Sequence, residues 1–328
     1  MANLDFLKDK KVLVTGATGF LGSNVMEELL KSGAKLRGTV HEKPIVIKDD
    51  RIEYLSADLT LAADCERAVA GMDYVIMCAA STAGAAVVEQ TPLKVVTPNV
   101  VMNALMLEAA YGAGIAKFVF ISSNAVYPPF EHPMKEEEMM SGPPFIKYYP
   151  VTWMKRFSEI LCETYSTWIK KPMKTIVIRP ANMYGPYDNF DLETSHVLPA
   201  LMRKVMERHD PIEVWGDGKE IKDLIYVKDF VEGLLLALEK IENYDPINLG
   251  TGVEVTINQA LKAMMKADGY EDAKISHNMS KPIMLKKRQL DPSKAEKLLG
   301  FKAKTSIEEG VAKTMAWYKE HYPRGYSS

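Results

Sequence analysis

Short apolar runs alternate with longer amphipathic segments through the first half of the chain. Most of the runs are rich in Val, Ile and Leu, and the segments between them place apolar residues at helical spacing. We predict strands over 11–15, 35–40, 52–56, 73–77, 117–122 and 175–179, and helices over 22–30 and 100–110. Strands that alternate with helices in this way predict an α/β fold with a doubly wound parallel sheet.

The alternation breaks at 142–150, a segment that contains three prolines. The next helix is predicted over 152–170. Its apolar and aromatic stripe consists of Phe157, Ile160, Leu161, Tyr165 and Trp168.

Beyond Pro180 the pattern loosens into short strands, many Gly and Pro breaks, and further helices. We predict these helices over 197–206, 229–238 and 258–266. The chain therefore divides into a first domain over 1–180 and a smaller, mixed and mostly helical substrate lobe over 181–328. We expect the chain to cross back to the main sheet near 220–250.

Composition and charge exclude several classes of protein. A net charge of −2 over 328 residues gives no basic excess for nucleic acid and no acidic tail. The longest uncharged stretch, 74–88, is too short to span a membrane, and the charged N-terminus lacks a signal-peptide core. Three cysteines without a C-x-x-C pair and scattered histidines predict a cytoplasmic protein without a metal site.

A glycine-rich loop, Gly16-Ala17-Thr18-Gly19-Phe20-Leu21-Gly22, lies between the first predicted strand and the first helix. Gly16 permits the tight turn, Gly19 lets the backbone approach a pyrophosphate, and Gly22 lets the helix pack closely on the strand. The helix N-terminus offers free N–H groups to the phosphates. These features predict an NAD(P)-binding Rossmann domain over 1–180.

The G-x-x-G-x-x-G spacing resembles that of the extended short-chain dehydrogenase/reductase family. Later motifs extend the resemblance over nearly the whole chain: Asp58-Leu59, Ala79-Ala80-Ser81, Asn99, the segments 122–127, 155–159 and 179–186, and the segments 248–252 and 288–291. The resemblance implies a homodimer with a nicotinamide cofactor. It places the cofactor contacts at Gly16, Thr18, Gly19, Phe20, Leu21, Gly22, His41, Asp58, Leu59, Ala79, Ala80, Lys155, Pro180 and Asn182.

The end of the second predicted strand bears on the choice of cofactor. NAD-preferring members tend to have Asp or Glu there, and Val40 offers no such acceptor. His41 and Lys43 could face a 2′-phosphate, or they could be solvated turn residues. The sequence thus favours NADP slightly and leaves NAD open.

The resemblance also implies a catalytic set of Ser, Tyr and Lys, in which Tyr lies four residues before Lys on the same helix face. Ser123 and Lys155 match the Ser and Lys positions, but Val151 stands where the Tyr is expected. Tyr149 is one candidate to replace it, although it belongs to another helix face. Pro150 is expected to push Tyr149 out of helical geometry.

Tyr148, Tyr127 and His196 are the other candidates for the proton-transfer role. Within the family, 184–190 and 195–201 look most like the GDP-4-keto-6-deoxymannose epimerase/reductases, or GDP-L-fucose synthases. That likeness gives His196 the part of an epimerisation acid, but Ala125 stands where the partner Cys would be. His196 could instead be a helix N-terminal histidine bonded to backbone.

The same likeness implies a nucleotide-diphosphate sugar as substrate. Arg288 and Lys222 match the positions of cations that bind the diphosphate, and Ser123 and Asn182 match sugar contacts. Both cations could also be solvated surface charges. Trp215 belongs either to a turn packed on the core or to the pocket for the base.

Two hypotheses follow from these residues. The first is an enzyme that oxidises, reduces or epimerises a nucleotide-linked sugar. The second is a cofactor-binding sensor or scaffold that kept the fold and lost catalysis, as the replacement of Tyr by Val151 would suggest.

Overall fold

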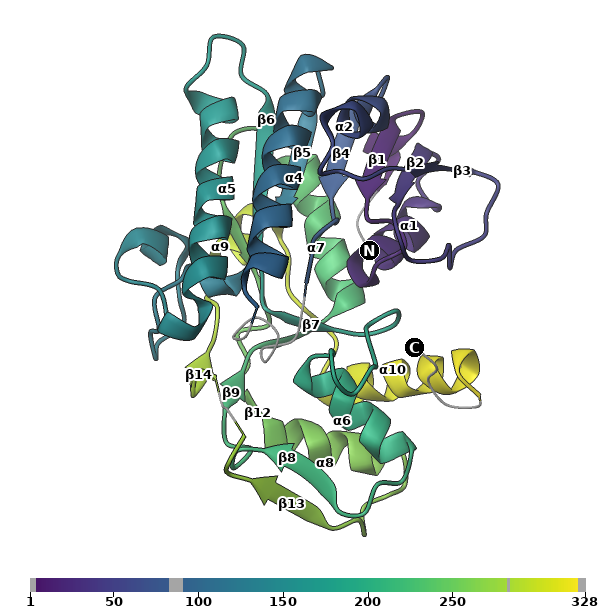
Figure 1. Ribbon diagram of the computed structural model, residues 1–328, viewed down its shortest axis with the longest axis vertical. Helices are drawn as coiled ribbons and strands as arrows, with labels where there is room; N and C mark the ends of the chain where they lie inside the picture. Colours follow the sequence, from purple (N-terminus) through teal and green to yellow (C-terminus); the bar gives the residue numbers. More distant parts are fainter. Residues whose placement is uncertain (1–3, 83–90, 282–283, 324–328) are drawn as a thin grey trace.

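A seven-stranded parallel sheet forms the upper part of the molecule (Figure 1). The computed structural model describes residues 4–82, 91–281 and 284–323. Across the sheet the strands are β11 (Ile247–Leu249), β6 (Lys174–Pro180), β5 (Lys117–Ile121), β4 (Tyr74–Met77), β1 (Lys11–Thr15), β2 (Lys35–Val40) and β3 (Ile52–Ser56). The predicted doubly wound parallel sheet is confirmed, and the strands at 11–15, 35–40 and 52–56 are confirmed residue for residue.

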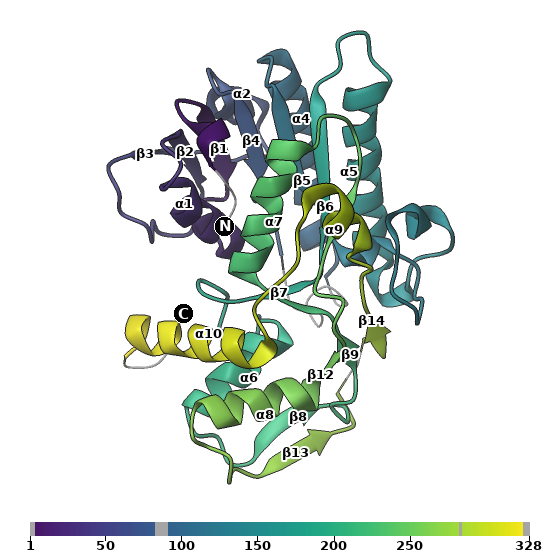
Figure 2. The same cartoon turned by 180° about the vertical axis from the view of Figure 1, so that it is seen from behind.

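Helices cover both faces of this sheet. The face in front in Figure 1 carries α2 (Ala62–Val69), α4 (Leu93–Gly112) and α5 (Tyr149–Thr167). The face in front in Figure 2 carries α1 (Phe20–Leu29), α7 (Val227–Lys240) and α9 (Ser293–Leu299). Side chains alternate between the two cores along each strand, so Leu13 belongs to one core and Val12 and Val14 to the other. Burial on both faces explains why the central strands β1, β4 and β5 are mostly apolar.

The lower lobe has an apolar core of its own. This core lies among α6 (Val197–Met206), α8 (Ile257–Ala267), α10 (Ile307–His321) and the parallel pair β8 (Ile212–Trp215) and β13 (Ile275–Asn278). Two small sheets lie between the lobes (Figure 1). They are formed by β7 (Asn182–Tyr184) with β10 (Leu224–Tyr226), and by β12 (Val255–Thr256), β9 (Ile221–Lys222) and β14 (Lys287–Arg288).

The second half of the sequence is shared between the two lobes. After β10 the chain returns to the upper lobe, where α7 packs on the sheet and β11 pairs with β6. The chain then enters the lower lobe for α8, and α9 lies again beside α7 and β11. The two lobes therefore share several chain crossings and present opposed surfaces at the carboxyl ends of the strands.

Helix α5 departs from the expected boundaries. It begins at Tyr149 instead of residue 152, with Pro150 in its first turn. The expectation that Pro150 removes Tyr149 from the helix is wrong, because the first turn needs no N–H from proline. The predicted apolar stripe is also only partly buried, since Phe157 and Ile160 are 46% and 43% exposed.

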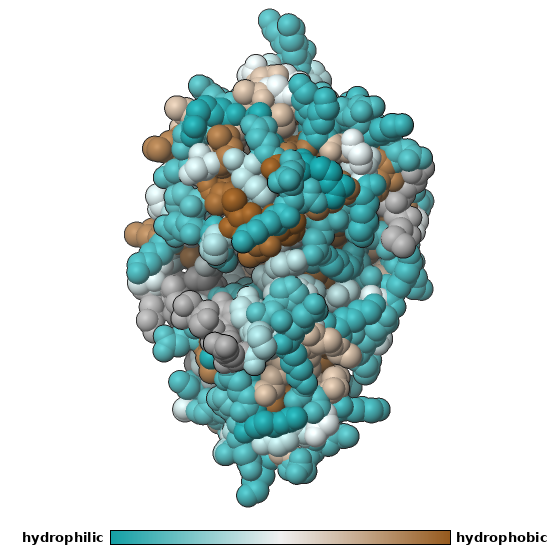
Figure 3. Space-filling model, turned by 90° about the vertical axis from the view of Figure 1, so that its right-hand side faces the viewer, coloured by the Kyte–Doolittle hydropathy of each residue, from teal (hydrophilic) through white to brown (hydrophobic). Residues whose placement is uncertain are grey.

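The surface is mostly hydrophilic on the side shown in Figure 3, with an apolar area in its upper half. None of the helices in the described part of the chain combines the length and apolar character that a membrane crossing needs. The uncharged stretch 74–88 begins with β4, and its residues 83–88 lie outside the described ranges. Cys65, Cys78 and Cys162 are free thiols.

A buried ion pair joins α5 to the sheet. The Arg179 guanidinium of β6 donates to the Glu159 carboxylate of α5 at 2.6 Å, and the side chains are 2% and 0% exposed. Ser122, at the end of β5, donates to the same carboxylate. Arg179 also donates to the Tyr127 hydroxyl at 2.8 Å, and Tyr127 donates to Asn248 of β11 at 2.6 Å. Burial alone would lower the pKa of Arg179, but Glu159 raises it, so the pair stays ionised.

Loss of one partner of this pair should be costly. We expect Arg179→Met to lower the free energy of unfolding by about 3–5 kcal/mol, because the Glu159 carboxylate would stay buried without its cation. Arg51, which is 65% exposed and pairs with Asp49, provides the matched control. Arg51→Met should cost less than about 1 kcal/mol. Urea titrations followed by circular dichroism measure both values, and equal losses would contradict the structural role of the buried pair.

Candidate functional site

The glycine loop forms a tight turn between the carboxyl ends of β1, β2 and β4. Gly16 has a φ of +61°, and its N–H donates to the Thr39 hydroxyl at 2.9 Å. The Thr15 hydroxyl accepts the N–H of Ala79 at 3.0 Å. A Cβ at Gly16 would meet the Ala79 backbone at 2.8 Å, so both the conformation and the space require glycine there.

The other two glycines of the loop have different roles. A Cβ on Gly22 would lie 2.1 Å from the Gly16 carbonyl oxygen, so Gly22 permits close packing of α1 on the turn. Gly19 has no strained φ, and a Cβ there would meet only the Gly16 oxygen at 3.2 Å. The first helical bond runs from Ser23 N–H to Gly19 at 2.9 Å, which leaves three earlier N–H groups at the N-terminus of α1. This cradle fits a dinucleotide pyrophosphate.

The carboxyl ends of β2 and β3 lie next to this turn. Hydrogen bonds from the hydroxyl and N–H of Thr60 lower the pKa of the Asp58 carboxyl, which therefore stays ionised. His41 is exposed and close enough to Asp58 to lower that pKa further. Leu59 is buried and Ala80 is exposed. An anionic and a basic group thus lie together where the cofactor ribose is expected.

Lys155 lies on the inner face of α5. Its Nζ donates to the Ile121 carbonyl at 2.8 Å, and burial lowers the pKa of this lysine to about 8. Ser123 follows the same strand and accepts the Ala125 N–H at 3.0 Å. The Thr152 hydroxyl of α5 donates to the Ala125 carbonyl at 2.7 Å. These bonds bring Ser123 and Lys155 to one end of β5.

The residues before Lys155 differ in their surroundings. Val151 lies one helical turn before Lys155 and on the same face. Tyr149 is 50% exposed and packs edge-on against Trp153 on the outer face. Tyr148 is half-buried beneath the Arg288 guanidinium, which lies 5.6 Å from the ring centre. The exposed position of Tyr149 argues against its candidacy as the proton donor.

Two cations lie side by side in the small sheet between the lobes. Arg288 of β14 and Lys222 of β9 occupy paired positions in adjacent strands. Arg288 is buried and donates to the Asn124 carbonyl, while its Nη2 has no hydrogen-bond partner among the described residues. Lys222 is half-buried and donates to the Leu285 carbonyl at 3.1 Å. The burial of Arg288 does not fit the alternative of a solvated surface charge.

Burial lowers the pKa of Arg288 to about 10. Desolvation lowers the pKa of Lys222, the charge of Glu220 acts in the opposite direction, and the charge of Arg288 lowers it again. Within the described residues neither cation forms an ion pair with a carboxylate. Two adjacent cations, one of them buried, are unfavourable without an anion in contact, so this arrangement is suited to an anionic ligand.

The remaining predicted residues surround the same region or lie further into the lower lobe. Asn182 is exposed at the start of β7 and accepts the Asn124 amide at 3.2 Å, while Pro180 is buried at the end of β6. His196 precedes α6 without a side-chain cap bond, and burial lowers its pKa. The absence of that bond removes the backbone-bonded alternative for His196. Trp215 donates to Glu213 at 3.1 Å within its own strand.

Sequence reasoning missed the contribution of two residues. Asn124 links Arg288 to Asn182, and Thr152 anchors α5 to the turn after β5. The position of Asn124 directly after Ser123 was the available signal. The motifs gave no signal for Thr152, because its partner lies on a separate segment.

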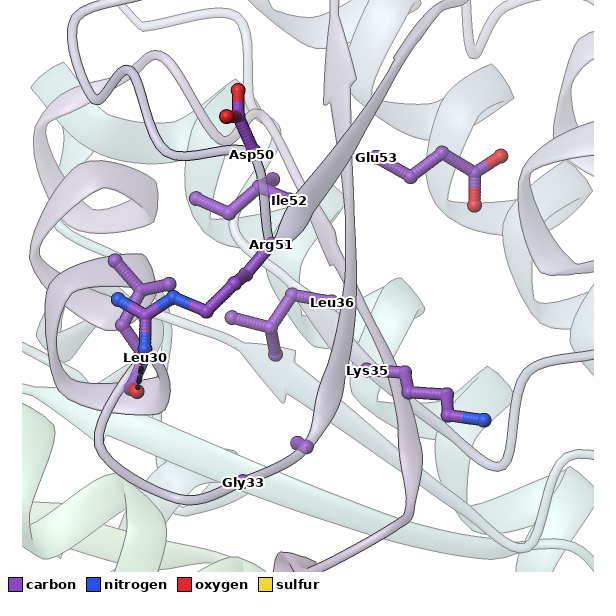
Figure 4. A pocket seen from close by; sticks show the side chains of 9 residues that line it. Leu30, Gly33, Lys35, Leu36, Asp50, Arg51, Ile52 and Glu53 are labelled. Carbon is purple, nitrogen blue, oxygen red and sulfur yellow. Dashed lines mark hydrogen bonds between the residues drawn. The ribbon is translucent and has the colours of Figure 1, made fainter.

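A pocket at the opposite end of the sheet does not belong to this site. It is lined by Leu30, Gly33, Ala34, Lys35, Leu36, Asp50, Arg51, Ile52 and Glu53 at the starts of β2 and β3. Figure 4 shows Arg51 bonded to the Leu30 carbonyl beside it. Ligands of such sheets bind at the carboxyl ends of the strands. In the described ranges no cluster of His, Cys, Asp or Glu side chains could hold a metal ion.

Comparison with known proteins agrees with this geometry. The model of the NAD dependent epimerase/dehydratase family matches residues 12–250. The chain is 28% identical to GDP-L-fucose synthase 1 of Arabidopsis thaliana over 320 residues, which cover 95% of this chain and 94% of that protein.

Two solved structures are similar along nearly their whole length. One is a GDP-L-fucose synthetase from Naegleria fowleri bound to NADP, with 26% identity, a TM-score of 0.81, and coverage of 98% of this chain and 96% of that chain. The other is a UDP-glucose 4-epimerase from Thermotoga maritima with UDP-glucose, with 26% identity, a TM-score of 0.83, and coverage of 95% and 99%. The resemblance inferred from the motifs is confirmed. The chain belongs to the NAD dependent epimerase/dehydratase family.

Proposed function

We propose that the protein is an NAD(P)-dependent enzyme that oxidises, reduces or epimerises a nucleotide-diphosphate sugar, in the manner of the GDP-L-fucose synthases. The observation that carries this proposal is the pair of adjacent cations, buried Arg288 and half-buried Lys222, neither of which forms an ion pair with a carboxylate in the described part of the chain. Arg288 donates to Asn124, which directly follows Ser123. A diphosphate bound there would direct the attached sugar toward Ser123 and Lys155.

Different residues of the site would bind the cofactor, orient the sugar and transfer protons. The turn at Gly16, Gly19 and the N-terminus of α1 binds the dinucleotide pyrophosphate. When bound, the nicotinamide group supplies or accepts a hydride. Lys155 orients the ribose, and Ser123 holds a sugar hydroxyl. Desolvation lowers the pKa of His196, and its imidazole can act as the acid in epimerisation.

The cofactor contacts extend to the ends of β2 to β4 and to β6 and β7. We assign them to Thr18, Phe20, Leu21, Gly22, His41, Asp58, Leu59, Ala79, Ala80, Pro180 and Asn182. His41 and Lys43 are exposed at the end of β2 and support NADP, while the ionised Asp58 beside His41 would accept a ribose hydroxyl of NAD. The similar enzyme from Naegleria fowleri binds NADP. Both cofactors therefore belong in a binding test, with NADP slightly favoured.

One observation favours a second function, a cofactor-binding sensor or scaffold. Val151 occupies the helix position one turn before Lys155 where a tyrosine is expected, and a general acid typically contributes about 10²–10⁴ in rate. Absorbance at the nicotinamide wavelength, measured with nucleotide sugars and NAD(P), separates the two. Net hydride transfer or formation of a new sugar product indicates the enzyme, whereas nucleotide binding with neither result indicates the sensor.

We further propose a homodimer in the cytoplasm. The outer face of α5 carries a stripe of exposed aromatic and apolar residues: Tyr149, Trp153, Phe157 and Ile160. The neighbouring α4 exposes Leu93, Val101 and Tyr111. Contiguous apolar surface of this kind is typical of protein interfaces. The three free thiols support a reducing compartment.

The second and third glycines of the loop, Gly19 and Gly22, should respond differently to substitution. Gly19→Val should retain the fold but abolish binding of NAD+ and NADP+, because its side chain occupies the space that the pyrophosphate needs. Gly22→Ala should instead destabilise the fold, since its Cβ collides with the Gly16 carbonyl. Calorimetric titration and thermal melting measure the two effects. Unchanged cofactor affinity in Gly19→Val would refute the pyrophosphate site.

Nucleoside diphosphates should stabilise the protein. GDP or UDP at millimolar concentration should raise Tm, because a ligand at 100 times its Kd stabilises the folded state by about 2.7 kcal/mol. Arg288→Ala should remove this shift, whereas Arg67→Ala, on the exposed surface of α2, should leave it unchanged. Thermal melts with and without nucleotide test this. If neither nucleotide stabilises the wild type, the proposed substrate class is wrong.

The outer face of α4 and α5 should control assembly. The wild type should elute as a dimer in size-exclusion chromatography with light scattering. Introducing charge with Trp153→Glu and Phe157→Glu should yield monomers, because two desolvated carboxylates would replace apolar contacts. Leu298→Glu, at an exposed position on α9, is the matched control. A monomeric wild type would contradict the proposed dimer.

A further inference from the structure

Three tyrosines near the site could replace the acid that is missing at Val151, and the structure distinguishes them. We propose that Tyr148 is the catalytic residue that exchanges the proton with the sugar oxygen during hydride transfer. This inference rests on the proposed function. It adds the identity of the residue that completes the site.

Tyr148 lies at the start of α5. It ends the short 3-10 helix before α5 and is the N-cap of α5, directly before the first turn. Val151 and Lys155 share the inner face of the helix. Tyr149 lies on the outer side, where it is exposed and packs against Trp153.

Tyr148 contacts the proposed diphosphate site. The Arg288 guanidinium lies 5.6 Å from the Tyr148 ring centre and donates to the Asn124 carbonyl. Arg288 therefore connects the Tyr148 ring to the residue after Ser123. A diphosphate bound to Arg288 would bring the attached sugar close to Tyr148.

The hydroxyl of Tyr148 is available for this role. Among the described residues it has no hydrogen-bond partner, and the ring is only half-buried. Burial raises the pKa of Tyr148, so the phenol carries its proton at neutral pH. The positive charge of Arg288 acts in the opposite direction and would stabilise the phenolate that forms after proton donation.

The other candidates are either bonded elsewhere or lie in the lower lobe. Tyr127 is fully buried, and its hydroxyl contacts Arg179 and Asn248. His196 lies at the start of α6 in the lower lobe. Tyr148 is the candidate that joins the start of α5 to the buried Arg288.

The proposed step balances in both directions. In reduction, a hydride from the reduced nicotinamide adds to the carbonyl carbon of the sugar, and the carbonyl oxygen takes the Tyr148 phenolic proton. Water then returns a proton to the phenolate. In oxidation, the phenolate accepts the hydroxyl proton while the hydride leaves the carbon for the oxidised nicotinamide.

The test compares variants that differ by one hydroxyl. With NAD+ or NADP+ and GDP-L-fucose, GDP-mannose or UDP-glucose as probes, Tyr148→Phe should lower kcat by about 10²–10⁴-fold. KM should change little, because the ring beneath Arg288 is retained. The kcat-against-pH profile should also lose the limb that reports phenol ionisation. Tyr149→Phe, the matched control on the outer face, should retain wild-type kcat and profile.

A second variant separates lost chemistry from lost folding. Val151→Tyr in the Tyr148→Phe background places a phenol on the inner face of α5 and should regain at least about tenfold in kcat. GDP affinity by calorimetry should be equal in the wild type and Tyr148→Phe. Equal kcat in the wild type and Tyr148→Phe would overturn the inference and leave the proposed function intact. A wild type that binds GDP but transfers no hydride with any probe would overturn both.

A spectroscopic measurement needs no turnover. The absorbance difference between the wild type and Tyr148→Phe during alkaline titration reports ionisation of this phenol alone. GDP should shift that titration to higher pH, since a diphosphate on Arg288 neutralises the charge that favours the phenolate. An unshifted titration with saturating GDP would place the phenol away from the diphosphate and overturn the inference.

Discussion

The ion pair between Glu159 and Arg179 is the constraint on which the geometry of the site depends. Both side chains are almost fully buried, and the carboxylate also accepts Ser122 at the end of β5. Lys155 lies one helical turn before Glu159 and donates to Ile121 of the same strand. Because a buried charge without its partner is costly, α5 is held at one height and rotation against the sheet. The position of Lys155 relative to Ser123 follows from that restraint.

A second pair of charges has the opposite character. Arg288, which is buried, and Lys222, which is half-buried, repel one another and have few partners. The folded chain tolerates this arrangement only at a cost in stability, and an anionic ligand would offset it. Strands β9 and β14 impose the arrangement, since they place the two residues in register across a small sheet between the lobes. Substrate binding and lobe contact therefore share the same few residues.

The two halves of the site differ in how freely they could change. A Cβ at Gly16 or Gly22 would lie within 3 Å of backbone atoms, so the glycine turn of the cofactor half allows almost no substitution at these positions. The inner face of α5 imposes no comparable steric requirement at Val151. A helix can exchange one residue on a face for another a turn away without moving its backbone. The proton-transfer residue can thus change position while the cofactor site stays constant.

The sequence by itself determined the features that local physics controls. Short runs that contain Val, Ile and Leu located β1, β2 and β3 residue for residue, and the glycine spacing identified the cofactor turn. The prediction that Pro150 excludes Tyr149 from the helix was wrong, because the effect of a proline depends on whether it lies inside a helix or in the first turn. The sequence also could not predict that the apolar stripe of α5 is exposed. Periodicity reveals an apolar helix face but does not show whether another part of the chain covers it.

Only the tertiary structure decided how distant segments meet. The sequence identified Arg288 and Lys222 separately, but their adjacency comes from the pairing of two strands that lie 66 positions apart in the sequence. The preference for Tyr148 over Tyr149 likewise depends on the rotation of α5 about its axis. The long-range bonds of Glu159, Thr152 and Lys155 set that rotation. Local propensity specifies elements, whereas packing between elements specifies which side chains share a site.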